Sequence, residues 1–251
     1  MKRFLTAALV LALLAVPLAA NAATPLVAGH WHNGHTCTAQ ATLWTGVYRV
    51  DNDVFDGSPD RSCIATTDGS DVILNTNYLP WDRGVVAYPD VRAGKFYGSA
   101  DPLFTALPMR TGAPGRLVLH LHATGTAGGY WLTDSDWWFY DSDVVRGHGR
   151  AELVIANQWS GYEPWCQRTL LIDRRHYCAS IRQTGGAGHS WPLIVLCLVR
   201  PRHWLRVDVA DVLTAVRRLH WIRGGKWLGS VAYGTEVWSG AKGLTDAMTV
   251  S

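Results

Sequence analysis

Two glutamates of this sequence lie in the middle of segments that have the residue pattern of β-strands. The 251-residue chain has only three glutamates, Glu152, Glu163 and Glu236. In residues 151–156, the neighbours of Glu152 are apolar and point to the opposite face of the strand. In residues 230–238, Glu236 shares a face with small residues that leave room for a ligand. Two carboxyl groups around one ligand suit glycosidic bond cleavage. One carboxylate meets the positive charge that develops at the anomeric carbon, and one carboxylic acid protonates the leaving oxygen.

A third acid, Asp136, precedes the first of these strands. If the segments on either side of residues 141–150 pair as a hairpin centred near Val144, Asp136 comes about opposite Glu152. Two like charges at that distance raise the pKa of one partner unless a ligand or water separates them. The alternative is that both strands show these acids to solvent on an outer face, which requires no site.

The aromatic content agrees with a carbohydrate cleft. The chain has 13 tryptophans, and sugars present apolar ring faces on which tryptophan and tyrosine pack. Most of these tryptophans are expected to pack in the core, and a minority to line the cleft.

Short runs rich in Val, Ile, Tyr and Trp, separated by Gly, Asp, Asn or Pro, predict the elements that would position these acids. We expect strands at residues 44–50, 71–75, 117–122, 136–140, 151–156, 190–199 and 228–238. One segment has helical periodicity, because apolar residues recur at steps of three and four from Val209 to Leu219 after a capping Asp208. The predicted fold is all-β, a sandwich of two antiparallel sheets with one packed helix at about residues 208–219.

The N-terminus indicates export. Lys2 and Arg3 precede an apolar run over residues 4–20 and a small-residue stretch that ends at Ala22, which is the layout of a signal peptide. We therefore divide the chain into a signal peptide at 1–22, an arm at 23–40 and one domain at 41–251, and expect a secreted protein. No later apolar run is long enough to span a bilayer, so we expect no membrane association after cleavage. The net charge of +3 includes Lys2 and Arg3, and gives no support for nucleic-acid binding.

Five cysteines follow the signal peptide, and an exported protein is able to form disulfides. Sequence alone leaves their pairing open. Cys37 with Cys63 would tie down the N-terminal segment, and Cys166 with Cys178 would close a short Arg-rich loop. Cys197 lies within an apolar run and is expected to remain a buried thiol.

Five segments resemble, in the correct order, motifs of glycoside hydrolase family 12, the retaining endo-β-1,4-glucanases and xyloglucanases with a β-jelly-roll fold. Residues 228–240 are similar to the family's closing strand around Gly-Thr-Glu, residues 152–156 to its Glu-Ile-Met-Ile-Trp segment, and residues 136–139 to its Asp-Ile-Trp-Phe strand. Residues 48–55 are similar to its Tyr-x-Val-x-Asn-Asn-x-Trp strand, and residues 86–91 to its Ser-Tyr-Pro-Asn stretch.

This resemblance extends from about residue 37 to residue 251. It implies that Glu152 is the nucleophile, that Glu236 is the acid/base, and that Asp136 forms a hydrogen bond with the nucleophile. It also implies a β-glucan polysaccharide as the partner, no cofactor, no metal and a monomeric protein. The side chains expected to bind substrate are Phe55, Trp138, Trp238 and Asn157.

The chain departs from the family pattern at several of these positions. Phe55 replaces a tryptophan that stacks on sugar, Asp53 replaces an asparagine, and Val154 and Ala156 replace a methionine and a tryptophan after the nucleophile. A weaker stacking floor suggests an altered substrate preference or low activity. The alternative function is therefore a secreted jelly-roll protein that binds carbohydrate and cleaves it weakly or not at all.

Two histidine groups offer alternative interpretations as metal sites. His30, His32 and His35 lie close to Cys37 in sequence, and imidazole with thiolate suits zinc or copper. The simpler interpretation is an N-terminal arm in which Cys37 is oxidised.

The second group is the pair His120 and His122, which alternates with leucines of the opposite face. An exposed polar strand face accounts for that pair.

Overall fold

The computed structural model describes residues 34–45, 48–55, 63–65, 72–75, 85–95, 106–124, 129–145, 147, 149–162, 164–186, 189–239 and 244–251. The strands are β1 (His35–Thr36), β2 (Thr42–Thr45), β3 (Tyr48–Val54), β4 (Ile64–Ala65), β5 (Val72–Asn75), β6 (Ala87–Gly94), β7 (Met109–Arg110), β8 (Val118–Thr124), β9 (Tyr130–Tyr140), β10 (Ala151–Ser160), β11 (Arg168–Ile172), β12 (Arg175–Gly186), β13 (His189–Leu198), β14 (Trp204–Asp208), β15 (Trp227–Ser239) and β16 (Leu244–Val250), and the helix is α1 (Val209–Arg218).

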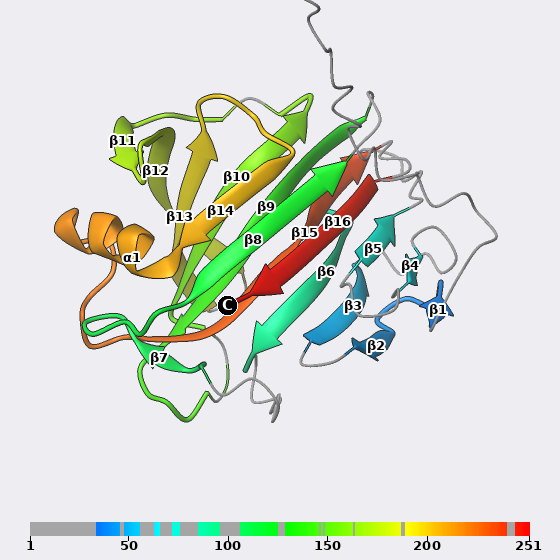
Figure 1. Cartoon of the computed structure of the whole chain (residues 1–251), viewed down its shortest axis with the longest axis horizontal. Helices are drawn as coiled ribbons and strands as arrows, with labels where there is room; N and C mark the ends of the chain where they lie inside the picture. Colours follow the sequence, from blue (N-terminus) through cyan, green and yellow to red (C-terminus); the bar gives the residue numbers. More distant parts are fainter. Residues whose placement is uncertain are drawn as a thin grey trace, which may run out of the picture.

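Two sheets form the layers of a sandwich. The larger sheet has the order β11-β12-β13-β10-β9-β15-β6-β3-β2, with β7 also paired to β15, and the smaller has the order β14-β8-β16-β5. Figure 1 shows the smaller sheet in front of the larger one, with α1 at one end of the sandwich. The predicted all-β sandwich with one packed helix is therefore confirmed. One pairing is not antiparallel, because β10 and β13 run parallel.

The alternation of side chains along each strand separates the core from the opposite face of the large sheet. In β9, Trp137 and Phe139 are fully buried in the main hydrophobic cluster, together with Leu119 and Leu121 of the smaller sheet. Side chains of β9 with even numbers, such as Asp136, point away from this core. The large sheet therefore buries one face in the main core, and its other face carries the acids together with smaller apolar clusters that contain Trp138, Val154 and Val195.

The hairpin of β9 and β10 forms one residue away from its predicted centre. Glu152 pairs with Trp138, and Asp136 pairs with Val154, so the prediction that Asp136 lies opposite Glu152 is wrong. A register centred on Val145 instead of Val144 produces this shift of two positions along the partner strand. The two acids still share a face, because a shift of two preserves the alternation.

The helix forms where its capping residue and apolar spacing predict it. Asp208 is the N-cap, and its Oδ1 accepts a hydrogen bond from the Ala210 backbone N–H at 3.1 Å. The buried side chains of α1 are Val209, Val212, Leu213 and Val216. They join the main hydrophobic cluster with Ile172 and Tyr177 of β11 and β12.

The predicted signal peptide and most of the predicted arm lie outside the described residues. Within residues 34–40, β1 pairs with β4, and a disulfide joins Cys37 to Cys63. A second disulfide joins Cys166 to Cys178, and Cys197 is a buried free thiol. In the part of the chain that the structure describes, no helix has the length and apolar character needed to span a membrane.

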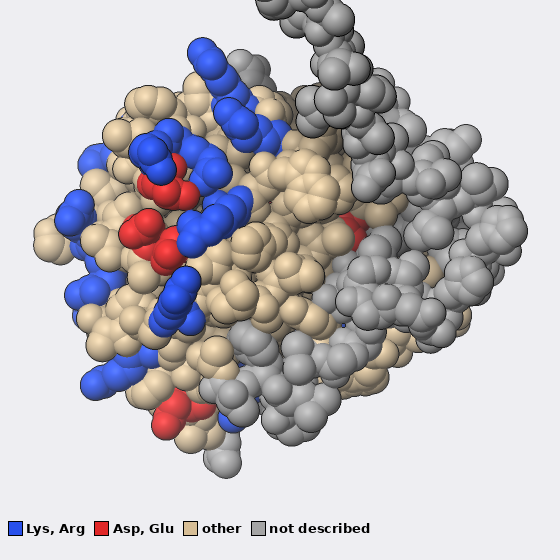
Figure 2. All heavy atoms as spheres, viewed as in Figure 1, with Lys and Arg blue, Asp and Glu red and all other residues tan. Residues whose placement is uncertain are grey.

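Positive charge on the face shown in Figure 2 gathers on the side that carries α1, with acidic groups among it. Arg175 contacts Asp173 at 2.9 Å, and Arg206 contacts Asp173 at 3.8 Å and Asp208 at 3.7 Å. These acids offset part of the positive charge, so a solvated face of mixed sign accounts for it.

Candidate active site

A groove crosses the face of the large sheet that points away from the core. It has a volume of about 490 Å³. The residues that line it come from β3, β6, β9, β10 and β15 and from adjoining segments, and are Gln40, Arg49, Asp53, Phe55, Val85, Tyr88, Arg92, Asp136, Trp138, Glu152 and Glu236. The three acids predicted from the sequence thus lie in one groove.

The two glutamates reach this groove from the strands on either side of β9. Glu152 of β10 pairs with Trp138 of β9, and Glu236 of β15 pairs with Leu132 of β9. Small residues of β15 lie on the same face as Glu236, as the sequence indicates, and they leave space between the two glutamates. At one of these, Gly234, an added Cβ would collide with the Pro89 carbonyl oxygen of β6, so close strand packing requires glycine there.

The environment of the two glutamates gives them different proton affinities. Burial, and then the negative charge of Glu152, raise the pKa of Glu236 to about 8, against a smaller lowering by Arg182. Burial also raises the pKa of Glu152, but the Trp191 indole N–H and the charge of Arg182 lower it. Glu236 is therefore the group that holds a proton near neutral pH, which suits a general acid.

Two aspartates of β9, the buried Asp134 and the half-buried Asp136, lie between these glutamates. Burial, and then the charge of Glu152, raise the pKa of Asp136 well above its usual range. Its neighbour Asp134 was not among the acids predicted from the sequence, and its pKa is also raised well above the usual range by burial and then by the charge of Glu236. The Tyr88 hydroxyl donates to Asp134 Oδ1 at 3.3 Å. Asp134 lies two residues before Asp136, so strand alternation was a signal able to identify it.

The hydrogen bond expected between Asp136 and Glu152 is not present. Glu152 Oε2 instead accepts from Trp191 Nε1 at 2.6 Å, and Asp136 Oδ2 accepts from Trp138 Nε1 at 2.6 Å. Asp136 Oδ1 is buried and accepts no hydrogen bond from a described residue. The register explains this difference, because it sets Trp138, and not Asp136, beside Glu152.

Comparison with solved structures identifies the same architecture in glycoside hydrolases. The endoglucanase Cel12A from Rhodothermus marinus superposes with a TM-score of 0.77 at 23% identity, over 87% of this chain and 98% of that chain. A family 12 xyloglucanase from Bacillus licheniformis gives 0.78 at 15% identity, over 87% and 99%. A metagenome-derived family 12 endoglucanase gives 0.72 at 25% identity, over 87% and 93%.

This chain has the fold of glycoside hydrolase family 12. The resemblance inferred from the sequence motifs is confirmed at the level of the fold, including the β-jelly roll. No family model matches the sequence, and no curated protein matches it.

The four side chains expected to bind substrate are placed differently in this family 12 fold. Phe55 and Trp138 line the groove, and Phe55 is 56% exposed. Trp238 is not among the lining residues, and its ring stacks on Tyr162 at 5.9 Å beyond the groove. It therefore extends an aromatic cluster that also contains Tyr130.

The prediction that Asn157 binds substrate is wrong. Asn157 is completely buried, accepts from the Tyr233 hydroxyl at 3.1 Å and donates to the Arg202 carbonyl oxygen at 2.9 Å. The register of β10 against β9 shifts between Ala156 and Gln158. This bulge leaves Asn157 unpaired in the ladder. Strand alternation accounts for the direction of its side chain, because Asn157 follows the core residues Leu153 and Ile155 on the face of β10 opposite to Glu152.

One end of the groove carries a charged network in place of the amides that the family pattern has there. Arg92 contacts Asp90 at 2.7 Å, Asp53 at 3.6 Å and Asp51 at 3.8 Å. Arg49 contacts Asp51 at 2.8 Å. The carboxylates of Asp51, Asp53 and Asp90 come close enough to hold a cation, but the Arg92 guanidinium already provides positive charge there. We therefore assign this group to the wall of the groove.

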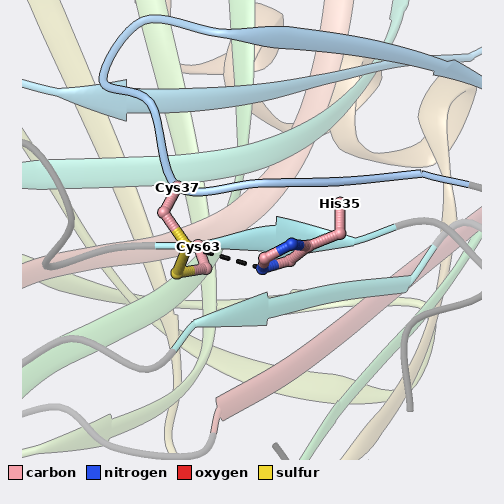
Figure 3. Close-up of side chains that lie close together, drawn as sticks. All are labelled: His35, Cys37 and Cys63. Carbon is pink, nitrogen blue, oxygen red and sulfur yellow. Dashed lines mark hydrogen bonds between the residues drawn. A yellow bond between two sulfur atoms is a disulfide. The ribbon is translucent and has the colours of Figure 1, made fainter. Parts of the chain in front are cut away.

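The proposed histidine metal site at the N-terminus is altered by oxidation of its cysteine. Figure 3 shows His35 beside the disulfide of Cys37 and Cys63, with His35 Nε2 3.4 Å from Cys37 Sγ. A disulfide sulfur is not the thiolate that binds zinc or copper. His30 and His32 lie outside the described residues.

The second histidine pair lies on the outer face of the smaller sheet. The ring of His122 stacks on Trp204 at 3.6 Å, and burial lowers its pKa. Ring packing therefore accounts for His122, while His120 is exposed.

Proposed function

We propose that the protein is a secreted, retaining endo-acting hydrolase of β-1,4-glucans, such as cellulose-like chains, mixed-linkage glucan or xyloglucan. The observation that carries this proposal is that Glu152 and Glu236 line the same groove with unequal proton affinities. The fold supports the same class of reaction, because the similar solved structures are named endoglucanases and xyloglucanases.

In the first step, the ionised carboxylate of Glu152 attacks the anomeric carbon and forms a glycosyl-enzyme ester. Glu236 gives its proton to the glycosidic oxygen, and the leaving sugar departs as an alcohol. A pKa of about 8 keeps Glu236 protonated at neutral pH. Once the ester has formed, Glu152 no longer carries a negative charge, and the pKa of Glu236 falls.

In the second step, Glu236 acts as a base. Its carboxylate removes a proton from a water molecule that attacks the anomeric carbon, and Glu152 leaves as a carboxylate. The sugar is released with its original configuration, because two inversions have occurred. Both glutamates then return to their starting protonation states.

The buried aspartates reduce the accumulation of charge in the groove. Four ionised carboxylates so close together would repel one another strongly. Burial raises the pKa of Asp134 and of Asp136 well above the usual range, and so opposes the ionisation of both beside Glu152.

The same proposal includes secretion and action as a monomer. The basic and apolar N-terminal sequence has the layout of a signal peptide. Two disulfides are compatible with folding in an oxidising compartment.

Reducing-sugar release tests the proposal. The mature protein is incubated with carboxymethyl-cellulose, barley β-glucan and xyloglucan, with Glu152→Gln as the inactive control. We expect release from at least one polymer by the wild type and none above background by the variant. Binding of these polymers without release would favour the alternative of a non-catalytic carbohydrate-binding protein, for which the substitution of Phe55 for tryptophan is the supporting observation.

A further inference from the structure

Trp191 supplies the nearest fixed contact to the proposed nucleophile. It lies in β13, which runs parallel to β10 and pairs Leu193 with Glu152. The Trp191 Nε1 atom is 2.6 Å from Glu152 Oε2. At that distance, the indole N–H donates a charge-assisted hydrogen bond to the carboxylate.

The Trp191 ring is held in place by its neighbours. It packs on Trp138 with ring centroids 5.4 Å apart and on His189 at 5.7 Å. Trp138 is fixed in turn, because it donates to Asp136 Oδ2 at 2.6 Å and because Gly149 leaves no space for a side chain against its ring. Two packed indoles therefore hold two different acids of the groove.

We propose that Trp191 is a positioning residue, which fixes Oε2 of Glu152 and leaves Oε1 as the attacking atom. This inference rests on the proposed function for its catalytic meaning. In this chain Trp191 donates to the nucleophile the hydrogen bond that the family resemblance implies for Asp136, while Asp136 accepts a hydrogen bond from Trp138.

The indole suits this role chemically. A tryptophan side chain is a donor only, so its hydrogen bond is strongest when the carboxylate is ionised. Consistently, the Trp191 hydrogen bond lowers the pKa of Glu152 against the effect of burial. A carboxyl group in the same place would add a like charge beside the nucleophile.

Other ionisable groups also act on Glu152. Asp134 and Asp136 approach from β9, Glu236 from β15, Arg182 from β12, and His189 lies beside Trp191 in β13. A test must therefore follow Glu152 itself and remove the indole N–H while an aromatic ring is retained. Trp191→Phe retains an aromatic ring and removes that donor.

Nuclear magnetic resonance provides a readout that does not depend on activity. Because the chain has only three glutamates, protein labelled at the glutamate carboxyl carbon gives three signals, which Glu152→Gln, Glu163→Gln and Glu236→Gln assign. We expect Trp191→Phe to raise the pKa of Glu152 by about one unit, the effect of losing one hydrogen bond to a charged group. The signal of Glu163 should not change.

Kinetics provide the second readout. In Trp191→Phe the acidic limb of kcat/KM should move to higher pH by the same amount, with kcat at the optimum reduced roughly tenfold and KM changed by less than about twofold. Trp204→Phe, on the outer face of the smaller sheet, is the matched control and should match the wild type in both readouts.

The outcomes separate this inference from the proposed function. An unchanged Glu152 titration and acidic limb in a folded, active Trp191→Phe would overturn the inference and leave the hydrolase standing. A raised Glu152 pKa in a protein that cleaves no glucan would support the contact and refute the hydrolase.

If Trp191→Phe does not fold, indole N–H signals of wild-type protein labelled with 15N-tryptophan replace it. One signal should titrate with Glu152 and lose that titration in Glu152→Gln. The lack of any such signal would overturn the inference.

Discussion

Glu152 and Glu236 line the same groove although their partners on β9, Trp138 and Leu132, are six positions apart. The two carboxyl groups thus reach the groove from a diagonal pair of positions on the strands flanking β9. Asp134 and Asp136 occupy the intervening positions of β9 on the same face. This arrangement gives the glutamates different neighbours and so different protonation states.

The first prediction uses azide to distinguish the roles of the two glutamates. Glu152→Ala and Glu236→Ala should each lose at least about 100-fold in kcat on β-glucan. With an activated aryl β-cellobioside and azide, Glu236→Ala should form the β-glycosyl azide, because azide attacks the glycosyl-enzyme. Glu152→Ala should form the α-glycosyl azide, because azide replaces the nucleophile. Product configuration by NMR checks the assignment, and the opposite configurations would reverse it.

A second prediction concerns the alkaline limb of the pH profile. Arg182 pairs with Leu193, which pairs in turn with Glu152, and its charge lowers the pKa of both glutamates. Without that cation the ionised form of Glu236 is less favourable, so its pKa rises. In Arg182→Gln we expect the alkaline limb of kcat/KM, near pH 8 in the wild type, to move upward by a few tenths of a unit.

Salt and charge provide the controls for this shift. Because Arg182 is exposed, the difference between wild type and Arg182→Gln should decrease at about 1 M salt. Arg182→Lys retains the charge and should keep the wild-type limb. A limb that does not move in Arg182→Gln at low salt would show that Arg182 does not act on Glu236.

A third prediction concerns the aromatic end of the groove. Phe55 lines the groove and is more than half exposed, at the position where the family pattern has tryptophan. Phe55→Trp adds stacking area for a sugar ring without entering the core. We expect KM for soluble β-glucan to decrease two- to fivefold, by roughly 0.5–1 kcal/mol of binding free energy, with kcat changed by less than about twofold. If Phe55→Trp and the wild type have the same KM, the side chain at position 55 does not contact the substrate.

The sequence predicted those features of the fold that depend on periodicity within one segment. Strand alternation places Leu119 and Leu121 in the core, and the helix begins at its capping Asp208. The same alternation placed Glu152 and Glu236 each on one defined face of its own strand, and both line the groove.

Some of the features that were missed depend on pairing between segments, whereas Asp134 was accessible from alternation along one strand. Trp191 contacts Glu152 through the parallel pairing of β10 with β13, which no local pattern indicates. The bulge at Asn157 is a property of two paired strands as well, but the burial of Asn157 follows from alternation along β10, which places it on the core face opposite to Glu152. The hairpin centre differed by one residue because turn-forming residues occur at both ends of the loop between β9 and β10, as Ser142, Asp143, Gly147 and Gly149, and no single one of them fixes the register.

The final prediction concerns stability and a buried acid behind the catalytic strand. Asp246 of β16 is completely buried. Its Oδ2 accepts a hydrogen bond at 2.7 Å from Oγ1 of Thr235, the residue that precedes Glu236. Burial raises the pKa of Asp246 to about 7, whereas an aspartate in an unfolded chain titrates near 3.9. Between these pH values the folded state keeps a proton that the unfolded state loses, so stability decreases as pH rises from about 4 to about 7.

Asp246→Asn removes this titration and retains an oxygen that accepts from Thr235. Urea unfolding at pH 5 and pH 8 measures the effect. The loss of stability between these two pH values should be smaller in Asp246→Asn than in the wild type by roughly 2 to 3 kcal/mol. Asp143→Asn, at an exposed position, should show the wild-type loss. If Asp246→Asn and the wild type lose the same stability, Asp246 is ionised in the folded protein at pH 5, and the Thr235 hydroxyl compensates its burial.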